Sequence, residues 1–240
     1  MLTIKDDRLN LGDGNSILDL GCGQGRHSFY LSKLGYLLVP VDISFDDLLY
    51  TSTIYKTMLE YGEIKKKSLA MSIEADALRL PFANNSFDCV IASEILEHID
   101  EDYLVISEIA RVIKPGAVLA VSVPRYYPEV INWLLSKKYH SVKGGHVRIY
   151  RKSQLLCRLR KENFYLTGID YAHGLHSPYW WLKCLVGVDN ERNLFVRLYK
   201  KLLEYEIIKQ PLFLKWVAKI LDPLLGKSIV IYTRYLPDAN

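Results

Sequence analysis

The sequence predicts an α/β fold in which a mostly parallel sheet of seven strands carries helices on both faces. Three observations predict this fold. Strand-like and helix-like segments alternate from the N-terminus, as they do in parallel sheets. A short apolar run over residues 16–20 leads directly into a loop with three glycines. An acidic residue, Asp42, follows the second predicted strand about twenty residues after that loop.

The first half of the chain reads as a regular alternation. The segment predicted as a helix over 101–113 shows the pattern most clearly, because Leu104, Ile106, Ile109 and Ile113 recur at helical spacing. We expect Pro115 and Gly116 to separate this helix from the next strand. The predicted strands are 16–20, 36–41, 69–74, 87–92 and 117–123, and the other predicted helices are 26–34 and 45–61.

The second half is less regular. Residues 125–147 read as a connection rich in tyrosine and lysine. Ser153 is suited to cap a helix over about 153–162, since its side chain can satisfy the first free N–H groups. We expect a sixth strand over 163–171 and a last strand over 228–235, which is strongly alternating and β-branched.

The loop after the first strand is the strongest functional signal. Gly21, Gly23 and Gly25 alternate with Cys22 and Gln24, directly after Asp19 and Leu20. Glycines let the backbone turn sharply and approach a ligand, and the following helix presents unpaired N–H groups. Asp19 would repel an anionic pyrophosphate and hold a cationic amine. The spacing also differs from the G-x-G-x-x-G pattern of dinucleotide-binding loops, which argues against a nicotinamide-dependent oxidoreductase.

This combination of strand, acid and glycines resembles motif I of the class I S-adenosylmethionine-dependent methyltransferases. The resemblance implies a Rossmann-like sheet, S-adenosylmethionine as cofactor and S-adenosylhomocysteine as product. It also implies that residues 19–25 (Asp19, Gly21, Cys22, Gly23 and Gly25 among them) surround the methionyl part of the cofactor. Asp42, with Ile43 beside it, matches motif II, whose acid accepts hydrogen bonds from the ribose hydroxyls. A cap on the following helix is the alternative role for Asp42.

Two further stretches resemble the type 11 methyltransferases. The first runs from Glu74 to Asp88 (E-A-D-A-L-R-L-P-F-A-N-N-S-F-D), and it implies that Asp76 and the Ala77 N–H read the adenine edge. The second is Ser93-Glu94-Ile95-Leu96-Glu97-His98-Ile99, at the carboxyl end of a central strand. We expect Ser93 and Glu94 to line the methyl-transfer site. His98 is the candidate general base, with a structural role as the alternative.

The resemblance covers about 16–123 well and 124–171 in outline. We therefore expect one methyltransferase domain over 1–240, with a cofactor-binding half at 1–123 and a substrate half at 124–240. In the class I family the last two strands form a hairpin, whereas here roughly fifty-five residues separate them. Residues 173–226 are accordingly interpreted as a helical cap. Its aromatic and aliphatic residues would enclose a lipophilic acceptor, contact a membrane surface peripherally, or pack onto the sheet.

Composition narrows the function further. The net charge of +4 is mild and no basic–aromatic RNA module occurs, so we expect no nucleic-acid partner. No apolar run is long enough to span a membrane and the N-terminus lacks a signal-peptide core, so the expected location is the cytoplasm. The four cysteines are far apart, and the histidines at 140, 146, 173 and 176 lack acidic or cysteine partners at ligand spacing, so no metal is expected.

We therefore predict an enzyme that methylates a small, lipophilic acceptor by in-line displacement. Two alternatives remain open: a methyltransferase acting on RNA or protein, and a catalytically silent module that binds S-adenosylmethionine. The sequence leaves the acceptor atom and the oligomeric state undetermined.

Overall fold

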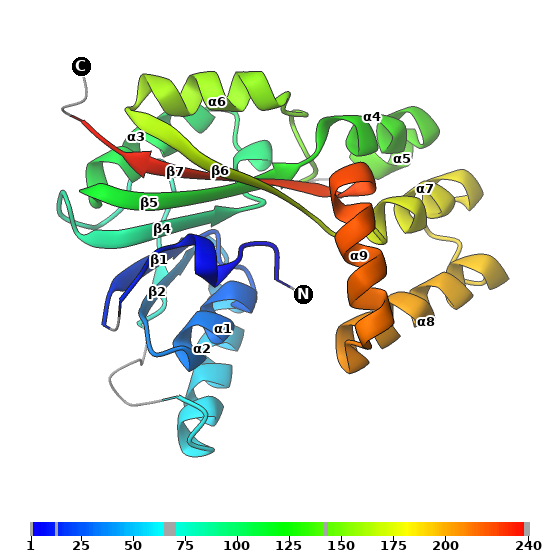
Figure 1. Cartoon of the computed structure of the whole chain (residues 1–240), viewed down its shortest axis with the longest axis horizontal. Coiled ribbons are helices and arrows are strands. Elements are labelled where there is room, and N and C mark those ends of the chain that lie inside the picture. The colour runs from blue at the N-terminus through cyan, green and yellow to red at the C-terminus, as the bar shows by residue number, and fades with distance from the viewer. Residues whose placement is uncertain (1, 13, 65–70, 142–143, 238–240) are drawn as a thin grey trace.

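A computed structural model describes residues 2–12, 14–64, 71–141 and 144–237. Its centre is a seven-stranded sheet in the order β3-β2-β1-β4-β5-β7-β6 (Figure 1). Strands β1 to β5 pair in parallel, and β7 runs antiparallel to both β5 and β6. This confirms the predicted mostly parallel sheet. The strands are β1 Ser16–Leu20, β2 Leu37–Asp42, β3 Ile73–Glu74, β4 Phe87–Ser93, β5 Ile113–Pro124, β6 Phe164–Ala172 and β7 Ser228–Tyr235.

Helices cover both faces of this sheet, as predicted. Figure 1 shows α3 and α6 above the strands and α1 and α2 below them. Two short 3₁₀ helices, η1 and η3, precede β1 and α3 respectively. The helices are η1 Asp6–Arg8, α1 Arg26–Lys33, α2 Phe45–Glu60, η3 Leu96–His98, α3 Asp102–Val112, α4 Tyr126–Leu135, α5 Lys137–His140, α6 Lys152–Lys161, α7 His176–Val186, α8 Leu194–Lys209 and α9 Leu212–Leu225.

The alternation of side chains along the buried strands builds two cores. Leu18 and Leu20 point to one face, where they belong to a cluster that includes Val105 of α3 and Leu155 of α6. Ile17 belongs to the opposite cluster, which includes residues of α1 and of the N-terminal segment. Strand β1 is therefore held from both sides, and its carboxyl end is a rigid base for the glycine loop.

The helix predicted over 101–113 is confirmed as α3 to within a residue at each end, and Ile113 already pairs with Phe87 of β4. Two other local predictions were wrong. Pro115 and Gly116 lie inside the long strand β5, where the register shifts, because an irregular pairing tolerates a missing N–H and a positive φ. The third strand is limited to Ile73–Glu74, and residues 69–70 of the predicted strand lie outside the described residues.

Two further corrections concern the second half of the chain. The connection predicted over 125–147 contains helices α4 and α5, and α4 is held by contacts with α7, whose Trp181 donates to the Pro128 carbonyl. Ser153 does not cap α6. Arg151 occupies the N-cap position, and its backbone N–H donates to the Gln154 side chain at 3.1 Å. The side chain that caps the N-terminus of α6 is therefore Gln154, one residue after Ser153.

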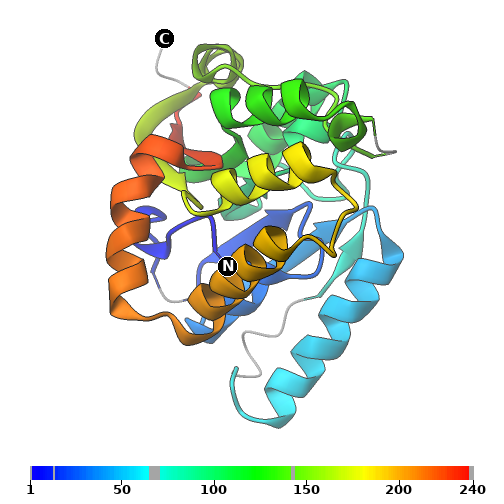
Figure 2. The same cartoon turned by 90° about the vertical axis from the view of Figure 1, so that its right-hand side faces the viewer.

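The predicted helical insertion lies between β6 and β7 and consists of α7, α8 and α9, which we call the cap. The cap has its own apolar cluster, which includes Leu175, Tyr179, Val196 and Leu214. Figures 1 and 2 place the cap beyond the end of the sheet at which β5 runs into α4. That end carries the carboxyl termini of the parallel strands.

Candidate functional site

A cavity of about 620 Å³ opens at the carboxyl ends of the central strands. Strands β1 and β4 are neighbours, but the chain leaves β1 toward α1 on one face and β4 toward α3 on the other. Such a switch point is where open α/β sheets bind ligands. The lining comes from the segments that follow four strands: Leu20, Gly21, Gly23, Val41, Asp42, Ile43, Ala75, Asp76, Ala77, Leu78, Glu94, Ile95, His98, Ile99 and Asp100.

The glycine loop forms one wall of this cavity. The N–H groups of Gly21 and Cys22 both donate to the Val41 carbonyl of β2, at 2.8 and 3.0 Å, which holds the loop against the neighbouring strand. Gly23 has a φ of +49°, and a Cβ built on it would meet nothing within 4 Å. A side chain there would stand in the cavity, so glycine keeps the space that a ligand would fill.

Cys22 and Gly25, also predicted to bind the cofactor, are absent from the cavity lining. The Cys22 Sγ lies 3.4 Å from the Gly23 carbonyl, and burial raises the pKa of this thiol, so it stays protonated. Gly25 begins α1 with a φ of +75°, where a Cβ would lie 2.8 Å from the Phe29 ring. Its place in the structure is explained by close packing between the loop and α1.

Asp42 stands at the tip of β2 and faces the cavity, with Ile43 beside it. Its two carboxylate oxygens accept hydrogen bonds from the Gly23 and Ser44 N–H groups, at 2.8 and 2.9 Å. Each oxygen retains further acceptor capacity for a ligand hydroxyl. The alternative role as helix cap belongs to Ser44, whose hydroxyl accepts from the Asp47 N–H. The ribose role of Asp42 stays a prediction that this geometry favours.

Asp19 is placed differently from the other acids. Its carboxylate is buried beneath the loop, outside the cavity lining, and accepts a 2.5 Å hydrogen bond from the Ser28 hydroxyl of α1. Burial raises the pKa of Asp19 to about 6, against the opposing effects of Ser28 and Arg26. The proposed interaction with a cationic amine would therefore act from below the loop, and it stays a prediction.

Asp76 and Ala77 follow β3, which ends at Glu74, and both line the cavity. One carboxylate oxygen of Asp76 accepts from the Leu78 N–H at 2.9 Å, which shapes the turn and leaves the other oxygen available. Leu78 also lines the cavity. An acid and a backbone N–H of the next residue at one wall suit the neighbouring donor and acceptor of an adenine edge.

Ser93 and Glu94 end β4. The Ser93 and Ser122 hydroxyls lie 2.8 Å apart, and Ser122 also donates to a Glu94 carboxylate oxygen at 3.1 Å. Glu94 has a φ of +57°, an unfavourable backbone conformation for a residue with a side chain. This conformation turns the chain toward the cavity, which Glu94 lines whereas Ser93 is buried behind it.

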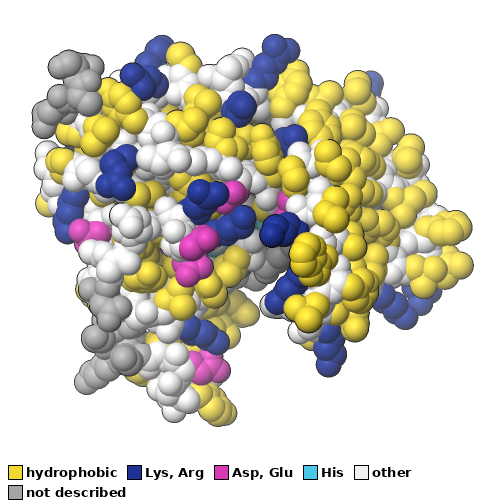
Figure 3. All heavy atoms as spheres, in the orientation of Figure 1, with side chains coloured by type: hydrophobic (Ala, Val, Ile, Leu, Met, Phe, Trp, Pro, Cys, Tyr) yellow, Lys and Arg dark blue, Asp and Glu magenta, His cyan; other side chains and the backbone are white. Residues whose placement is uncertain are grey.

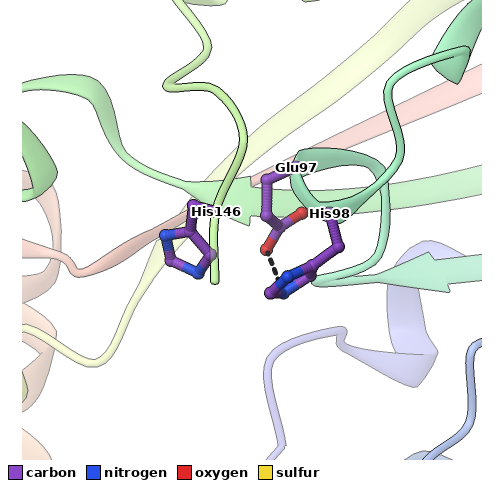
Figure 4. Close-up of side chains that lie close together, drawn as sticks. All are labelled: Glu97, His98 and His146. Carbon is purple, nitrogen blue, oxygen red and sulfur yellow. Dashed lines mark ion pairs between the residues drawn. The ribbon is translucent and has the colours of Figure 1, made fainter. Parts of the chain in front are cut away.

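His98 lies on η3 and lines the cavity, and two residues that the sequence did not single out accompany it. The carboxylate of Glu97 is fully buried, and neither oxygen has a hydrogen-bond partner among the described residues. Burial, with the nearby Glu94 charge, raises the pKa of Glu97 well above its usual range. Glu97, His98 and His146 each offer a ligand atom within 4.8 Å of the others, which overturns the premise that no acidic partner is available to a histidine (Figure 4).

Sequence reasoning also missed the apolar wall. Ile95 and Ile99 line the cavity, and Ile95 packs so closely on Gly21 that a Cβ there would lie 2.6 Å from the Ile95 Cδ1. The sequence does indicate this wall indirectly, because Ile95 and Ile99 closely follow Glu94 and the end of a predicted strand. His146 carried no such signal, since forty-eight positions separate it from His98.

The strand order with β7 reversed between β5 and β6, together with the cavity at the switch point, agrees with the Rossmann-like fold that the sequence predicted. The family model described as "Methyltransferase domain" matches residues 18–121. Residues 18–121 thus match the type 11 methyltransferase family model, as the sequence motifs predicted.

Two relatives are similar to part of this chain in sequence, and a solved structure is similar to it in fold. The chain is 31% identical over 116 residues to the O-methyltransferase resE of Aspergillus sclerotiorum, covering 48% of this chain and 42% of the relative. It is 35% identical over 114 residues to a demethylmenaquinone methyltransferase of Corynebacterium kroppenstedtii, covering 48% and 44%. The chain thus spans less than half the length of these relatives. A Methanosarcina mazei structure described as a SAM-dependent methyltransferase superposes with a TM-score of 0.65 at 17% identity, covering 98% of this chain and 99% of that one.

Proposed function

We propose that the protein transfers a methyl group from S-adenosylmethionine to a small, lipophilic acceptor by in-line displacement. The observation that carries this proposal is the cavity at the switch point, where the glycine loop, Asp42 and Asp76 face one space together with Glu94. The cofactor supplies an electrophilic methyl group. The protein's contribution is to hold both reactants in line and exclude water, which lowers the barrier by several kcal/mol, on the order of 7–11 in favourable cases.

The lipophilic character of the acceptor is supported by the cavity wall beyond the acids. Ile95 and Ile99 line the cavity on the side of Glu94, so the wall there is apolar. The names of the two relatives, one of which acts on demethylmenaquinone and the other on an oxygen, are compatible with this acceptor class. His98 faces the same space and would be the residue beside the reacting acceptor.

Calorimetric titration tests the cofactor, with S-adenosylhomocysteine as ligand and NAD as a parallel control. We expect stoichiometric binding of the first and none of the second. Methyl-release assays with hydroquinones and phenols, then with total RNA and with protein substrates, test the acceptor. Turnover of RNA or protein alone would overturn the lipophilic proposal. Cofactor binding without turnover of any class would favour the catalytically silent alternative.

We propose in addition that the cap contacts a membrane surface from which a lipophilic acceptor is taken. Helix α9 presents an apolar stripe to solvent at helical spacing: Phe213, Trp216, Ile220 and Leu224 are each 59–66% exposed. A solvent-facing stripe is normally polar. Hydrophobic side chains gather over the side of the molecule that carries the cap in Figure 3.

The charges around this stripe favour an anionic surface. Lys215 and Lys219 lie on α9 itself, and α8 adds Lys200, Lys201 and Lys209. Among the described residues, no helix has the length and hydropathy needed to cross a membrane. The chemistry is therefore that of an amphipathic surface lying on a bilayer, with apolar residues inserted and lysines at the headgroups.

Co-sedimentation with phosphatidylglycerol-containing vesicles tests this contact. A double variant, Phe213→Ser with Trp216→Ser, should lose most of the binding. The control removes two exposed aromatic residues elsewhere, Tyr61→Ser with Tyr103→Ser, and should bind as the wild type does. Equal loss in both variants, or no binding by the wild type, would contradict a membrane role for the cap.

A further inference from the structure

Beside the cofactor cavity, three side chains from two separate segments surround one point. Glu97 and His98 come from η3, and His146 comes from the segment that precedes α6. The close-up shows the Glu97 carboxylate directed toward the His98 ring, with the His146 ring beside them (Figure 4). The Glu97 carboxylate and the His98 Nε2 are 3.9 Å apart, and the centroids of the two rings are 4.9 Å apart.

The orientation of both rings is set by hydrogen bonds on their far sides. The His98 Nδ1 lies 2.9 Å from the Gly144 carbonyl, and a carbonyl only accepts, so this nitrogen carries the proton. The His146 Nδ1 lies 2.7 Å from a carboxylate oxygen of Glu129. The Nε2 of each ring, on the side away from these acceptors, is the atom left for a ligand. Rings held this way by a carbonyl or a carboxylate are the usual arrangement of histidines that bind metals.

The second ring is held by a buried acceptor. Glu129 is 1% exposed, and its carboxylate also accepts hydrogen bonds from Trp133 Nε1 at 3.1 Å and from the Asn132 amide at 3.3 Å. The two segments are tied by their backbones as well, because the Val147 N–H donates to the Glu97 carbonyl at 2.9 Å. The cluster is thus positioned by contacts that do not involve the three candidate atoms.

Glu97 is the side chain that needs a partner. It is 0% exposed, and neither of its carboxylate oxygens has a hydrogen-bond partner among the residues that the structure describes. Burying such a group without a partner is costly. The His98 Nε2 lies 3.9 Å from its Oε1, which is beyond hydrogen-bond distance. A cation at the centre of the cluster would satisfy the carboxylate and both nitrogens at once.

We propose that Glu97, His98 and His146 bind a divalent transition-metal ion of the zinc type. Two imidazoles and one carboxylate are a common donor set for Zn²⁺, Mn²⁺ and Fe²⁺. Bonds of about 2.0–2.2 Å place two ligand atoms on the order of 3.4 Å apart in a tetrahedral site. The present atoms lie within 4.8 Å of one another, so closing the site around an ion requires them to move inward.

The position of this site refines the role of His98. His98 lines the cofactor cavity, so a metal bound to its Nε2 would have an open coordination position toward that space. The consequence for catalysis rests on the proposed methyl transfer: the ion would bind an acceptor hydroxyl and lower its pKa, and His98 would act as a ligand instead of a proton acceptor. Metal binding itself does not depend on that role.

Direct titration of the chelator-treated protein tests the proposal without any methyl-transfer assay. Zn²⁺ is followed by calorimetry, and Co²⁺ by its visible d–d absorption, which reports the coordination geometry. We expect one equivalent of Co²⁺ with bands of a four- or five-coordinate site. Glu97→Gln and His146→Gln should each weaken binding at least tenfold. His140→Gln, a histidine stacked on Trp133 outside the cluster, is the matched control and should bind as the wild type does.

Two results would overturn the site: no stoichiometric binding by the wild type, or wild-type affinity in His146→Gln. The second result would place the metal elsewhere. Binding of S-adenosylhomocysteine, measured in the same samples, separates this question from the proposed function and shows that each variant is folded. Should Glu97→Gln fail to fold, His98→Gln supplies the second variant, since its side chain is 36% exposed and its loss leaves the core intact.

Discussion

The buried carboxyl of Asp19 makes the stability of the protein depend on pH in a way that one substitution isolates. Asp19 lies 1% exposed beneath the glycine loop, and burial raises its pKa from 3.8 to about 6. A shift of about two units corresponds to about 3 kcal/mol. The perturbation is Asp19→Asn, which keeps an oxygen to accept the Ser28 hydrogen bond and removes the ionisation.

The sign follows from the direction of the shift. Because the folded protein binds the Asp19 proton more tightly than the unfolded chain does, ionisation of this group lowers the free energy of unfolding. The loss begins near pH 4, where the unfolded chain ionises, and is complete above about pH 7, where the folded protein has also ionised. The free energy of unfolding of Asp19→Asn minus that of the wild type should therefore rise by about 3 kcal/mol from acidic to neutral pH.

Urea unfolding of both proteins at intervals from pH 4 to pH 8 measures this difference. Other groups titrate equally in the two proteins, so their contributions cancel in the subtraction. A difference that is independent of pH would refute the reasoning. A second readout addresses the ligand: if an amine lies above Asp19, the affinity of the wild type for S-adenosylhomocysteine should rise with pH through about 6, and that rise should be absent in Asp19→Asn.

Three further predictions concern the cofactor wall, a buried histidine and the cap. Asp42→Ala should weaken S-adenosylhomocysteine binding about tenfold or more by calorimetry, since Asp42 faces the cavity and organises the Gly23 N–H; unchanged affinity would remove the ribose assignment. Burial lowers the pKa of His27 to about 3, so the free energy of unfolding of the wild type falls as the pH drops below 6.5, where the unfolded chain binds the proton. Between pH 7 and pH 5 the free energy of unfolding, measured with urea, should fall by about 2 kcal/mol less in His27→Gln than in the wild type. Equal falls in the two proteins would contradict this. A Cβ on Gly174 would lie 2.6 Å from the Leu221 carbonyl carbon, so Gly174→Ala should destabilise the protein by about 1–3 kcal/mol in thermal unfolding. The control is Gly12→Ala, which should change the stability little because its Cβ would lie 3.6 Å from the Asn15 Oδ1.

Much of the cofactor half could be predicted from sequence because its signals are local. A buried strand followed by closely spaced glycines requires no distant partner to be recognised, and β1, α1, β2 and α2 begin and end within a residue or so of the predicted bounds. The same applies to the order of Asp42, Asp76 and Glu94, each of which follows a strand. In a parallel sheet the carboxyl ends of strands meet at one edge, so their convergence on one cavity followed from the fold.

The long connection after β5 was not predictable in the same way. Residues 125–147 contain no strong helix signal beyond scattered aromatic residues, and α4 is stabilised by packing that includes contacts with α7 of the cap. Trp181 of α7 donates to the Pro128 carbonyl of α4, fifty-three residues away in the sequence. Such pairings depend on how the cap folds back, and no local pattern encodes them.

By itself, the sequence determined the fold class, the cofactor loop and the identity of the acids that follow the strands, because each depends on neighbouring residues and on the rules of parallel sheets. Tertiary structure alone decided two other matters. It buried Asp19 beneath the loop instead of in the cavity wall, and it brought His146 against Glu97 and His98 through hydrogen bonds with Glu129 and Gly144. These outcomes depend on distances between segments far apart in the chain, which only the folded backbone establishes.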